Sequence, residues 1–289
     1  MNIGKGYFGE VFLVKSKADN NNYAIKKIEL KKVEDEGDYK KNINREVSIL
    51  QNCDHVSVVK YYESWREQGK TGSDLAAIYI RMEHCPLDLY EFCKSIKSIY
   101  KRNTNEVICL VSYFIMLTMV EEILVALDYL HSKNIMHRDI KQWNILLKRD
   151  GNNWVKLSDF GLAKVEDAYS QTHTNVGTAT YKAPEVKWGG HYTTSADVFS
   201  LGIMLIQFFD LDINKQDVHH ELKDLFASMI AGKATERPTC KQSLADINKP
   251  PLVYDLDKVR ADHHNISLLG QDEFLKSYYT NKMQLKSDN

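Results

Sequence analysis

The sequence predicts an α+β protein in which strands and helices are segregated along the chain. Segments rich in β-branched and aromatic residues lie within the first 82 residues, separated by polar turns that contain Gly, Asp or Asn. From residue 87 onward, apolar residues mostly form long runs or recur at helical spacing. A run of strands followed by a run of helices is typical of the α+β class.

Length and charge narrow the classes of function. The chain has 289 residues, which is long enough for a sizeable core and for one or two domains. Its 39 acidic and 38 basic residues give a formal net charge of −1, so no basic field suggests nucleic acid as a direct partner. The five cysteines show neither paired nor metal-type spacing, which indicates free thiols in a reducing compartment and favours a cytoplasmic location.

No stretch predicts insertion into a membrane. The N-terminus shows no signal-peptide pattern, because a glycine-rich stretch follows Met1 almost at once. The most apolar run, residues 107–120, is shorter than the ~20 residues that span a bilayer. We therefore expect a buried helix at this place and no membrane partner.

A glycine motif opens the chain, and its context predicts a phosphate-binding hairpin. Residues 3–11 read Ile-Gly-Lys-Gly-Tyr-Phe-Gly-Glu-Val, a G-x-G-x-x-G-x-V pattern that also resembles a dinucleotide fingerprint. A dinucleotide site needs a strand before the motif and a helix after it, whereas here two β-rich segments follow, at 11–14 and 23–26. Glycines between antiparallel strands let the backbone approach phosphates closely. Val11 and Ala24 would add apolar surface for an adenine ring.

Lys26 ends the second of these segments and is expected to hold phosphates. A lone lysine after apolar residues is usually a surface charge, but its place after a glycine loop favours a ligand. Such a lysine is held by a glutamate on a helix, and residues 39–52 carry an approximately helical apolar face. We predict that Glu46 is this partner; the alternative is a solvated helix carboxylate.

The next predicted elements lead from the sheet to the chemistry. Two strands, at 56–65 and 76–82, are joined by a polar turn, after which the chain leaves the sheet at 83–86. Helices are expected at 87–100 and 107–133. The second of these helices delivers the chain to the most informative stretch of the sequence.

An acid, a cation and an amide lie close together between His137 and Leu147. Asp139, Lys141 and Asn144 fit the needs of phosphoryl transfer, which are an acceptor for a hydroxyl proton, a positive charge and an oxygen ligand for Mg²⁺. The pattern H-R-D-x-x-x-x-N resembles the catalytic loop of protein kinases, and the roles of these residues rest on that resemblance.

A short strand at 154–158 ends in the tripeptide Asp-Phe-Gly at 159–161. In a strand–turn setting after the preceding loop, this tripeptide is a specific signal of a protein kinase. Asp159 would then bind Mg²⁺ that bridges the ATP phosphates, and the packing of Phe160 would set the active or inactive state.

The hydroxyl-rich segment 162–180 precedes the tripeptide Ala-Pro-Glu at 183–185. An activating phosphate is expected between these motifs, on Thr174 or Thr178. Thr174 better fits the phosphosite position, whereas Thr178 matches the threonine that contacts the catalytic loop. Arg138 is a cation that is available to pair with such a phosphate.

Two further residues are expected to stabilise this machinery from a distance. Asp197 lies in the first turn of a buried helix and is expected to cap backbone amides of the catalytic loop. Arg237 is expected to form an internal ion pair with Glu185, which would make both residues structural.

The order of these motifs resembles that of a eukaryotic-type protein kinase from residue 3 to about 254. The resemblance implies a two-lobed fold, with a small antiparallel β-rich lobe that has one key helix and a larger, mainly helical lobe. It also implies ATP and Mg²⁺ as cofactors, and Lys141 favours a serine or threonine acceptor on a protein substrate. The kinase domain is expected over residues 1–254, with the N-lobe at 1–82, the hinge at 83–86, the C-lobe at 87–254 and a C-terminal tail of unknown role at 255–289.

The resemblance assigns roles at the matching positions. Asp139, Lys141 and Asn144 are the implied catalytic residues, and Asn144 and Asp159 are the implied metal ligands. The residues implied to bind ATP come from the glycine motif, the strands, the hinge and the catalytic region: Ile3, Gly4, Lys5, Gly6, Tyr7, Phe8, Gly9, Glu10, Val11, Ala24, Lys26, Glu46, Met82, Glu83, Cys85, Leu146 and Asp159.

Within the kinases, the segments 44–50, 58–65 and 78–86 look like those of the translation initiation factor 2 alpha-subunit kinases. Those enzymes respond to stress by phosphorylating a serine of that subunit, which lowers translation. The implied partners are therefore this alpha subunit and a second copy of the chain, bound through the N-lobe. NIMA-related kinases carry similar segments and are the alternative, with a different substrate. A pseudokinase scaffold without turnover is the alternative from another class.

Several positions depart from the kinase pattern. Gln142 stands where a proline is usual and should loosen the catalytic loop slightly, and Lys182 replaces an apolar residue near the substrate cleft. The segment 197–237 is short and is expected to lack much of the helix with which initiation-factor kinases dock their substrate. Because Met1 lies just before the glycine motif, we expect almost no first strand, a fragment or a reduced protein, and any sensor domain outside the chain.

Overall fold

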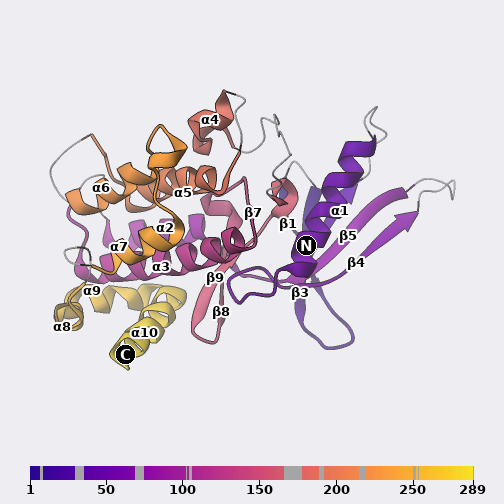
Figure 1. Cartoon of the computed structure of the whole chain (residues 1–289). Coiled ribbons are helices and arrows are strands. Elements are labelled where there is room, and N and C mark those ends of the chain that lie inside the picture. Colours follow the sequence, from indigo (N-terminus) through magenta and orange to yellow (C-terminus); the bar gives the residue numbers. More distant parts are fainter. Residues whose placement is uncertain are drawn as a thin grey trace.

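The protein folds into two parts with different secondary structure, which lie side by side in Figure 1. The computed structural model describes residues 1–6, 9–29, 36–68, 75–101, 103, 106–165, 178–188, 192–214, 219–249, 252 and 254–288. Strands dominate up to residue 83, and helices dominate after it. The predicted α+β class is therefore confirmed.

The small lobe is built on a five-stranded antiparallel sheet in the order β1-β2-β3-β5-β4. Its strands are β1 (Asn2–Gly6), β2 (Gly9–Lys15), β3 (Asn22–Glu29), β4 (Tyr61–Gln68) and β5 (Leu75–Glu83). One helix, α1 (Glu36–Asn52), lies beside this sheet in Figure 1. The apolar face predicted for the helix is real, since Ile49 and Leu50 are buried in the same core as Ile80 of β5.

Two strands differ from the predicted extents. The sequence predicts almost no first strand, whereas β1 covers five residues because the glycine motif itself pairs with β2. Strand β4 begins at Tyr61 and not at residue 56, because the residues before it pair with the large lobe instead. Leu157 N donates to Ser57 O over 2.8 Å, and Val59 N donates to Leu157 O over 2.9 Å. This parallel pairing is a backbone link between the two lobes.

The large lobe is mainly helical and carries two small sheets. Its helices are α2 (Leu89–Tyr100), α3 (Leu110–Ser132), α4 (Pro184–Lys187), α5 (Thr194–Phe209), α6 (His220–Met229) and α7 (Cys240–Ile247). One sheet has the order β6-β8-β9 and the other pairs β7 with β10. These strands are β6 (Leu87–Asp88), β7 (Ile135–Met136), β8 (Ile145–Asp150), β9 (Asn153–Leu157) and β10 (Lys164–Val165). Single 3₁₀ turns lie at Gln142–Asn144, Phe160–Leu162, Ala179–Tyr181, Ala234–Glu236 and Leu269–Gln271.

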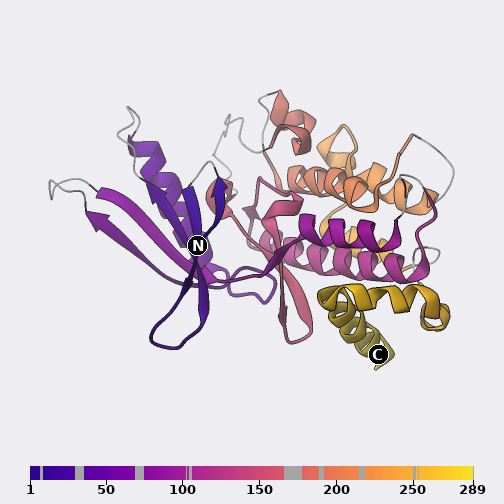
Figure 2. The ribbon, with the colours of Figure 1, turned by 180° about the vertical axis from the view of Figure 1, so that it is seen from behind.

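Helix α3 runs through the middle of the large lobe, as both ribbon views show (Figures 1 and 2). It is apolar on most sides, and most of its side chains are buried. Among the described residues it is the one helix that is long and apolar enough to cross a membrane, judged by length and composition alone. The sequence predicts that residues 107–120 are too short to span a bilayer, but the whole helix is long enough. Its apolar composition is explained by its burial in the protein core.

A short connector joins α5 to α6. Helix α5 ends where Asp210 adopts a left-handed backbone conformation with φ of 53°, and α6 begins at His220. No helix lies between them in the part of this connector that the structure describes. The prediction that much of the substrate-docking helix of initiation-factor kinases is missing between α5 and α6 stays a prediction, because residues 215–218 lie outside the described part of the chain.

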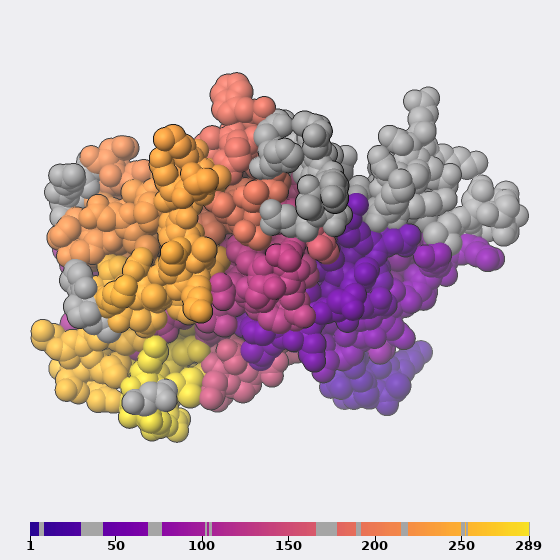
Figure 3. All heavy atoms as spheres, in the orientation of Figure 1, coloured from indigo at the N-terminus to yellow at the C-terminus, as the bar shows by residue number. Residues whose placement is uncertain are grey.

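Three helices follow α7 and pack on the large lobe: α8 (Leu256–Ala261), α9 (His263–Leu268) and α10 (Glu273–Ser287). Each begins after an aspartate, Asp255, Asp262 or Asp272, whose carboxylate accepts from backbone N–H groups of the first turn. Leu275 and Tyr278 of α10 are completely buried. In Figure 3 the yellow residues of α10 lie directly against the pink residues of the β8–β9 hairpin.

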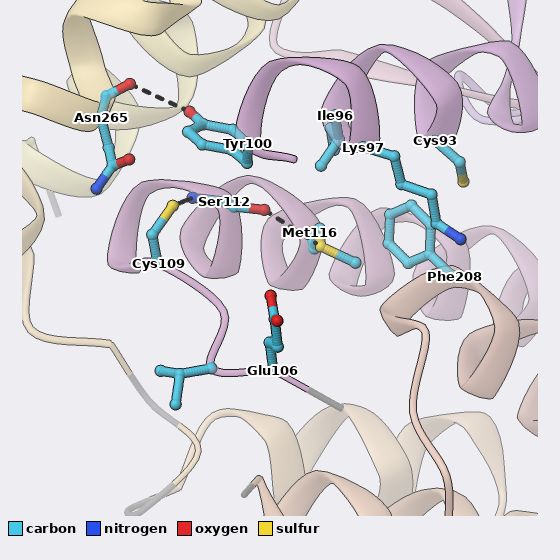
Figure 4. Close-up of a pocket in the computed structure, with 11 residues that line it drawn as sticks. Cys93, Ile96, Lys97, Tyr100, Glu106, Cys109, Ser112, Met116, Phe208 and Asn265 are labelled. Carbon is cyan, nitrogen blue, oxygen red and sulfur yellow. Dashed lines mark hydrogen bonds between the residues drawn. The ribbon is translucent and has the colours of Figure 1, made fainter. Parts of the chain in front are cut away.

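A small cavity of about 130 Å³ lies within the large lobe between α2, α3 and the C-terminal helices (Figure 4). The hydroxyl of Tyr100 donates to the backbone carbonyl of Asn265 over 3.3 Å and closes one side. Burial raises the pKa of its Cys93 thiol to about 12, so this sulfur is not a reactive thiolate. This volume is below the ~300 Å³ that is usual for ligand sites, so the cavity is not a candidate functional site.

Candidate active site

A cleft of about 860 Å³ lies between the two lobes, and this volume is in the range of ligand-binding sites. Both lobes contribute, since β1, β2 and β3 line one side and the stretch 141–146 lines the other. Of the predicted ATP-binding residues, the following line it: Ile3, Gly4, Lys5, Gly9, Val11, Ala24, Lys26, Glu46, Met82, Glu83, Cys85, Leu146 and Asp159.

The other predicted site residues fall into three groups. Lys141, Asn144 and Thr178 also line the cleft, and Asp139, which does not line it, is hydrogen-bonded to all three. Gly6 lies on β1, and Glu10 lies on β2 without lining the cleft and forms an exposed ion pair with Lys5 over 3.1 Å. Tyr7, Phe8 and Thr174 lie outside the described residues.

The glycine motif forms the antiparallel β1–β2 pair over the cleft. Gly4 faces Val11 and Gly6 faces Gly9 across the two strands. Gly9 has a φ of 140°, and a Cβ at this position would lie 2.1 Å from the carbonyl oxygen of Lys27 on the neighbouring strand. A side chain cannot fit there, so this glycine is needed for the strands to pair so closely.

Lys26 joins two carboxylates at the centre of the cleft. Its Nζ lies 2.6 Å from Oε1 of Glu46 and 2.8 Å from Oδ1 of Asp159. Burial disfavours the charged amine, but the two carboxylates outweigh it and raise the pKa of Lys26 above its usual range. Burial likewise disfavours the charged form of Asp159, yet the ammonium group of Lys26 keeps the pKa of that carboxyl below its usual value. A fixed positive charge therefore stands where the glycine hairpin would deliver phosphates.

Asp139 is the acceptor at the centre of a polar cluster in the large lobe. Its Oδ2 accepts from Lys141 Nζ over 2.6 Å and from Asn144 Nδ2 over 2.9 Å. Its Oδ1 accepts from the hydroxyl of Thr178 over 3.0 Å, and Lys141 Nζ also donates to that hydroxyl over 3.3 Å. The acid, the cation and the amide predicted from the sequence thus touch one another, with a threonine hydroxyl against the acid.

Asp197 holds the loop that carries this cluster. It is completely buried and accepts from the backbone N–H groups of His137 and Arg138, each over 2.8 Å. Arg138 has a φ of 70°, a strained conformation that these bonds fix in place. Burial opposes ionisation of Asp197, but its hydrogen bonds outweigh burial and lower the pKa. The predicted cap of the catalytic loop is confirmed.

Asn144 and Asp159 lie at the two base ends of the β8–β9 hairpin. Asn144 directly precedes β8, and Asp159 follows β9 after a single residue, Ser158. Ser158 ties the ends together, because its N–H and its hydroxyl both donate to Asn144 O over 3.0 Å. Phe160 is buried against His137, with ring centroids 5.1 Å apart, and so fixes the place of Asp159.

The oxygen atoms at this base fit a Mg²⁺ ion that is shared with phosphates. Asn144 uses its amide nitrogen to donate to Asp139, so its amide oxygen is the atom that would bind an ion together with the carboxylate of Asp159. No group of three or more His, Cys, Asp or Glu side chains among the described residues could hold a metal alone. One carboxylate and one amide oxygen, completed by phosphate oxygens and water, are typical of Mg²⁺ sites with nucleotides.

Comparison with known proteins identifies this constellation. A family model described as the protein kinase domain matches residues 1–213. The chain belongs to this family. Protein kinases use ATP and Mg²⁺, which agrees with the predicted cofactors, and the two-lobed fold predicted from the resemblance is confirmed.

Individual relatives include kinases of two kinds. Over 211 residues (72% of this chain, 16% of the relative), the kinase domain is 33% identical to serine/threonine-protein kinase Nek1 of Mus musculus. Over 286 residues (91% of this chain, 46% of the relative), it is 30% identical to serine/threonine-protein kinase Nek3 of Oryza sativa subsp. japonica. Over 266 residues (84% of this chain, 48% of the relative), it is 29% identical to the interferon-induced, double-stranded RNA-activated protein kinase of Mus musculus. The chain thus spans less than half the length of each of these relatives.

The hinge of this kinase domain is tied to the large lobe through Glu83. The carboxylate of Glu83 accepts from Lys60 N over 2.8 Å and from Lys148 Nζ over 2.9 Å, and it lies 3.1 Å from Lys156 Nζ. Its side chain therefore serves the junction between the lobes, and any contact of Glu83 with a nucleotide falls to its backbone. Burial raises the pKa of the Cys85 thiol to about 12, so this hinge residue is not a reactive nucleophile.

The predicted ion pair between Arg237 and Glu185 is confirmed. Two guanidinium nitrogens of Arg237 donate to the two carboxylate oxygens of Glu185, each over 2.7 Å. Arg237 also donates to the carbonyl oxygens of Ala231 and Ser195, over 2.8 and 3.1 Å. The pair anchors the end of the activation segment to the helices of the large lobe.

Sequence reasoning missed one aromatic residue of the site. Trp143 lines the cleft, is 47% exposed and stacks on Tyr90 of α2 with ring centroids 4.9 Å apart. Its position inside the predicted catalytic loop was a signal that could have found it. Gln142, expected to loosen the loop, is buried.

Proposed function

We propose that the chain is an ATP-dependent protein serine/threonine kinase. The observation that carries this proposal is the convergence of Lys26, Asn144 and Asp159 on one cleft between the lobes, with Asp139 hydrogen-bonded to the cleft residues Lys141 and Asn144. Membership of the protein kinase family and the relatives named above support it.

In the proposed reaction the residues of the chain bind, orient and move a proton. Lys26 holds phosphate oxygens and is kept in place by Glu46, while the glycine hairpin covers the same phosphates. When bound, Mg²⁺ supplies the charge neutralisation between the phosphate groups, and Asn144 and Asp159 would hold it. Asp139 orients the acceptor hydroxyl and accepts its proton. Lys141, 2.6 Å from Asp139, offers positive charge to the transferred phosphoryl group.

For the activation segment we propose Thr174 as the phosphosite. The hydroxyl of Thr178 already bonds to Asp139 and Lys141, so a phosphate on it would place negative charge against the carboxylate of Asp139. Thr178 then acts as a positioning residue of the catalytic loop. Mass spectrometry of the active protein tests this assignment, and a phosphate on Thr178 without one on Thr174 would contradict it.

For the substrate we propose a serine of the translation initiation factor 2 alpha subunit, phosphorylated in response to stress. The segments at 44–50, 58–65 and 78–86 and the similarity to the double-stranded RNA-activated kinase support this substrate. The similarity to Nek1 and Nek3 supports the alternative, a NIMA-related kinase with other targets, equally well. A cytoplasmic location and a homodimer through the small lobe belong to the same proposal.

One experiment separates these readings. The purified chain is incubated with γ-labelled ATP, Mg²⁺ and either the alpha subunit or a generic basic protein substrate. Transfer to the alpha subunit alone supports the initiation-factor assignment, and transfer to the generic substrate alone favours the NIMA-related one. Absence of label on both substrates and on the chain itself would overturn the kinase proposal and leave a pseudokinase scaffold.

A further inference from the structure

The C-terminal helix α10 lies against the hairpin that carries the two proposed metal ligands. Strand β8 starts directly after Asn144, and β9 ends two residues before Asp159. Helix α10 lies beyond residues 1–213, which the kinase family model matches. Figures 1 and 2 show α10 beside this hairpin in both views.

Side chains of α10 bind the tip of the hairpin directly. The indole N–H of Trp154 donates to Oδ1 of Asn281 over 2.9 Å, and Lys282 Nζ donates to the carbonyl oxygen of Asn152 over 2.7 Å. The rings of Trp154 and Tyr278 pack edge to face, with centroids 5.3 Å apart. The turn of the hairpin and its first β9 residues are therefore fixed by hydrogen bonds and by aromatic packing.

Helix α3 completes the same contact through Glu122. One carboxylate oxygen of Glu122 accepts from the backbone N–H groups of Trp154 and Val155, over 2.7 and 2.9 Å. Its other oxygen lies 2.5 Å from Lys282 Nζ. Glu122 and Lys282 are both buried, so this ion pair is shielded from solvent and binds α10, α3 and β9 together.

Further along the hairpin, toward its base, two lysines reach the hinge. Lys148 of β8 and Lys156 of β9 both pair with Glu83, over 2.9 and 3.1 Å, and Lys156 also pairs with Asp150 over 2.7 Å. The hairpin is thus held at its tip by α10 and along its side by the hinge. Its base, with Asn144 and Asp159, is joined to both contacts through the strands β8 and β9.

We propose that α10 is a clamp that positions the Mg²⁺ ligands of this kinase, with Asn281 and Lys282 as its positioning residues. This inference rests on the proposed function, since it concerns the site for Mg²⁺ and nucleotide. Neither residue touches the cleft. They act by limiting motion of the β8–β9 hairpin, so that the amide oxygen of Asn144 and the carboxylate of Asp159 meet one ion in a fixed geometry.

The test compares two lysines of the same helix. Lys282→Met removes the bond to Asn152 and the pair with Glu122, whereas Lys286→Met removes the outer pair between Lys286 and Glu121, 2.8 Å in length, and the contact of Lys286 with the ring of Tyr254, none of which involves the hairpin. Glu122→Gln combined with Lys282→Met avoids a buried, unpaired carboxylate and still loses the bond to Asn152. Trp154→Phe removes the bond to Asn281 together with part of the ring that packs on Tyr278, while Lys282 and Glu122 stay intact. This variant serves if the lysine variants fail to fold.

Two readouts do not depend on turnover. Hydrogen–deuterium exchange of residues 145–157 without nucleotide reports the mobility of the hairpin, and titration of a fluorescent ATP analogue at increasing Mg²⁺ reports the site. We expect Lys282→Met, alone and in the double variant, to raise hairpin exchange and to weaken Mg²⁺-dependent binding about 3- to 10-fold, with Lys286→Met unchanged. Trp154→Phe should give a smaller shift in the same direction.

The proposal is overturned if Lys282→Met and the double variant unfold at lower temperature but match Lys286→Met in exchange and in Mg²⁺-dependent binding. That result would make the contact merely structural. Absence of phosphate transfer by the unaltered chain would instead contradict the kinase proposal and would leave the exchange comparison intact.

Discussion

The two lobes hold their halves of the cleft by different means. In the small lobe, Lys26 depends on one buried ion pair with Glu46 and reaches across the cleft to Asp159. In the large lobe, the catalytic loop is held by Asp197, whose two oxygens accept bonds from two backbone amides and two side chains. The small-lobe half therefore depends on one pair of charges, and the large-lobe half depends on several hydrogen bonds that can be lost in steps.

This difference predicts how each half fails. Loss of one member of a buried ion pair leaves the other charge uncompensated, which is costly and abrupt. Loss of one hydrogen bond among several costs only about 0.5–1.5 kcal/mol when the group left behind still finds a partner. Asp139, the proposed proton acceptor, differs from both halves. Its removal changes the chemistry of the site and not the contacts that hold the site together.

Asp139→Asn should have the largest effect. The amide keeps the size of the side chain but cannot accept the hydroxyl proton, so kcat should fall by about 10²- to 10⁴-fold. Binding of a fluorescent ATP analogue should stay within about threefold, because Asp139 does not line the cleft where Lys26 and the glycine hairpin do. Phosphate transfer at the rate of the unaltered chain would contradict the role of this residue.

Lys26→Met should come next, with Lys27→Met as its matched control. Lys27 is the neighbouring residue of β3, but it pairs with Glu29 outside the cleft, over 2.8 Å. Removal of Lys26 takes away the charge that holds phosphate and leaves Glu46 buried alone, so kcat/KM should fall by about 10²- to 10³-fold. Glu46→Gln should give a smaller loss of the same kind. If Lys27→Met were as damaging as Lys26→Met, the central place of Lys26 would be wrong.

The sequence predicted the residues that belong to short motifs, because these motifs occur in a fixed order along the chain. Lys26, Glu46, Asn144 and Asp159 line one cleft, and Asp139 is hydrogen-bonded to Asn144 beside them. Local patterns also predicted most helices and strands, since apolar spacing and turn residues act over a few positions.

The clamp by α10 could not be predicted in this way. Asn281 and Lys282 lie more than a hundred residues from the hairpin that they bind, and neither belongs to a motif. Pairing of residues 57–59 with Leu157 escaped prediction for the same reason, since nothing local distinguishes a strand that continues β4 from one that crosses to the other lobe. Both features depend on tertiary packing, which overrides local preference.

Asp197→Asn should separate the support of the loop from its chemistry. Asparagine retains one acceptor oxygen, so two of the four donors around Asp197 lose their partner, at a cost of about 2–4 kcal/mol. Thermal unfolding should shift down by roughly 4–10 °C, with a loss of kcat of about 10-fold. Tyr192→Phe removes a single bond of 2.9 Å to the same carboxylate and should shift both quantities in smaller measure. If Tyr192→Phe lowered the unfolding temperature and kcat as much as Asp197→Asn does, the hydrogen bonds around Asp197 would not be lost in steps.

Substitutions of Thr178 should have the smallest effects and compare single hydrogen bonds, because its hydroxyl joins Asp139 to Lys141. Thr178→Val removes that hydroxyl at nearly constant volume and should lower kcat by about 3- to 10-fold, whereas Thr178→Ser should keep the bonds and most of the activity. Thr178→Glu places a carboxylate against Asp139 and should lower kcat further than Thr178→Val, since two negative charges would then share Lys141. Steady-state rates of the three variants with one protein substrate measure this order. Activation by Thr178→Glu would instead identify Thr178 as the site of an activating phosphate, and the bonds to Asp139 and Lys141 would then describe only the unphosphorylated state.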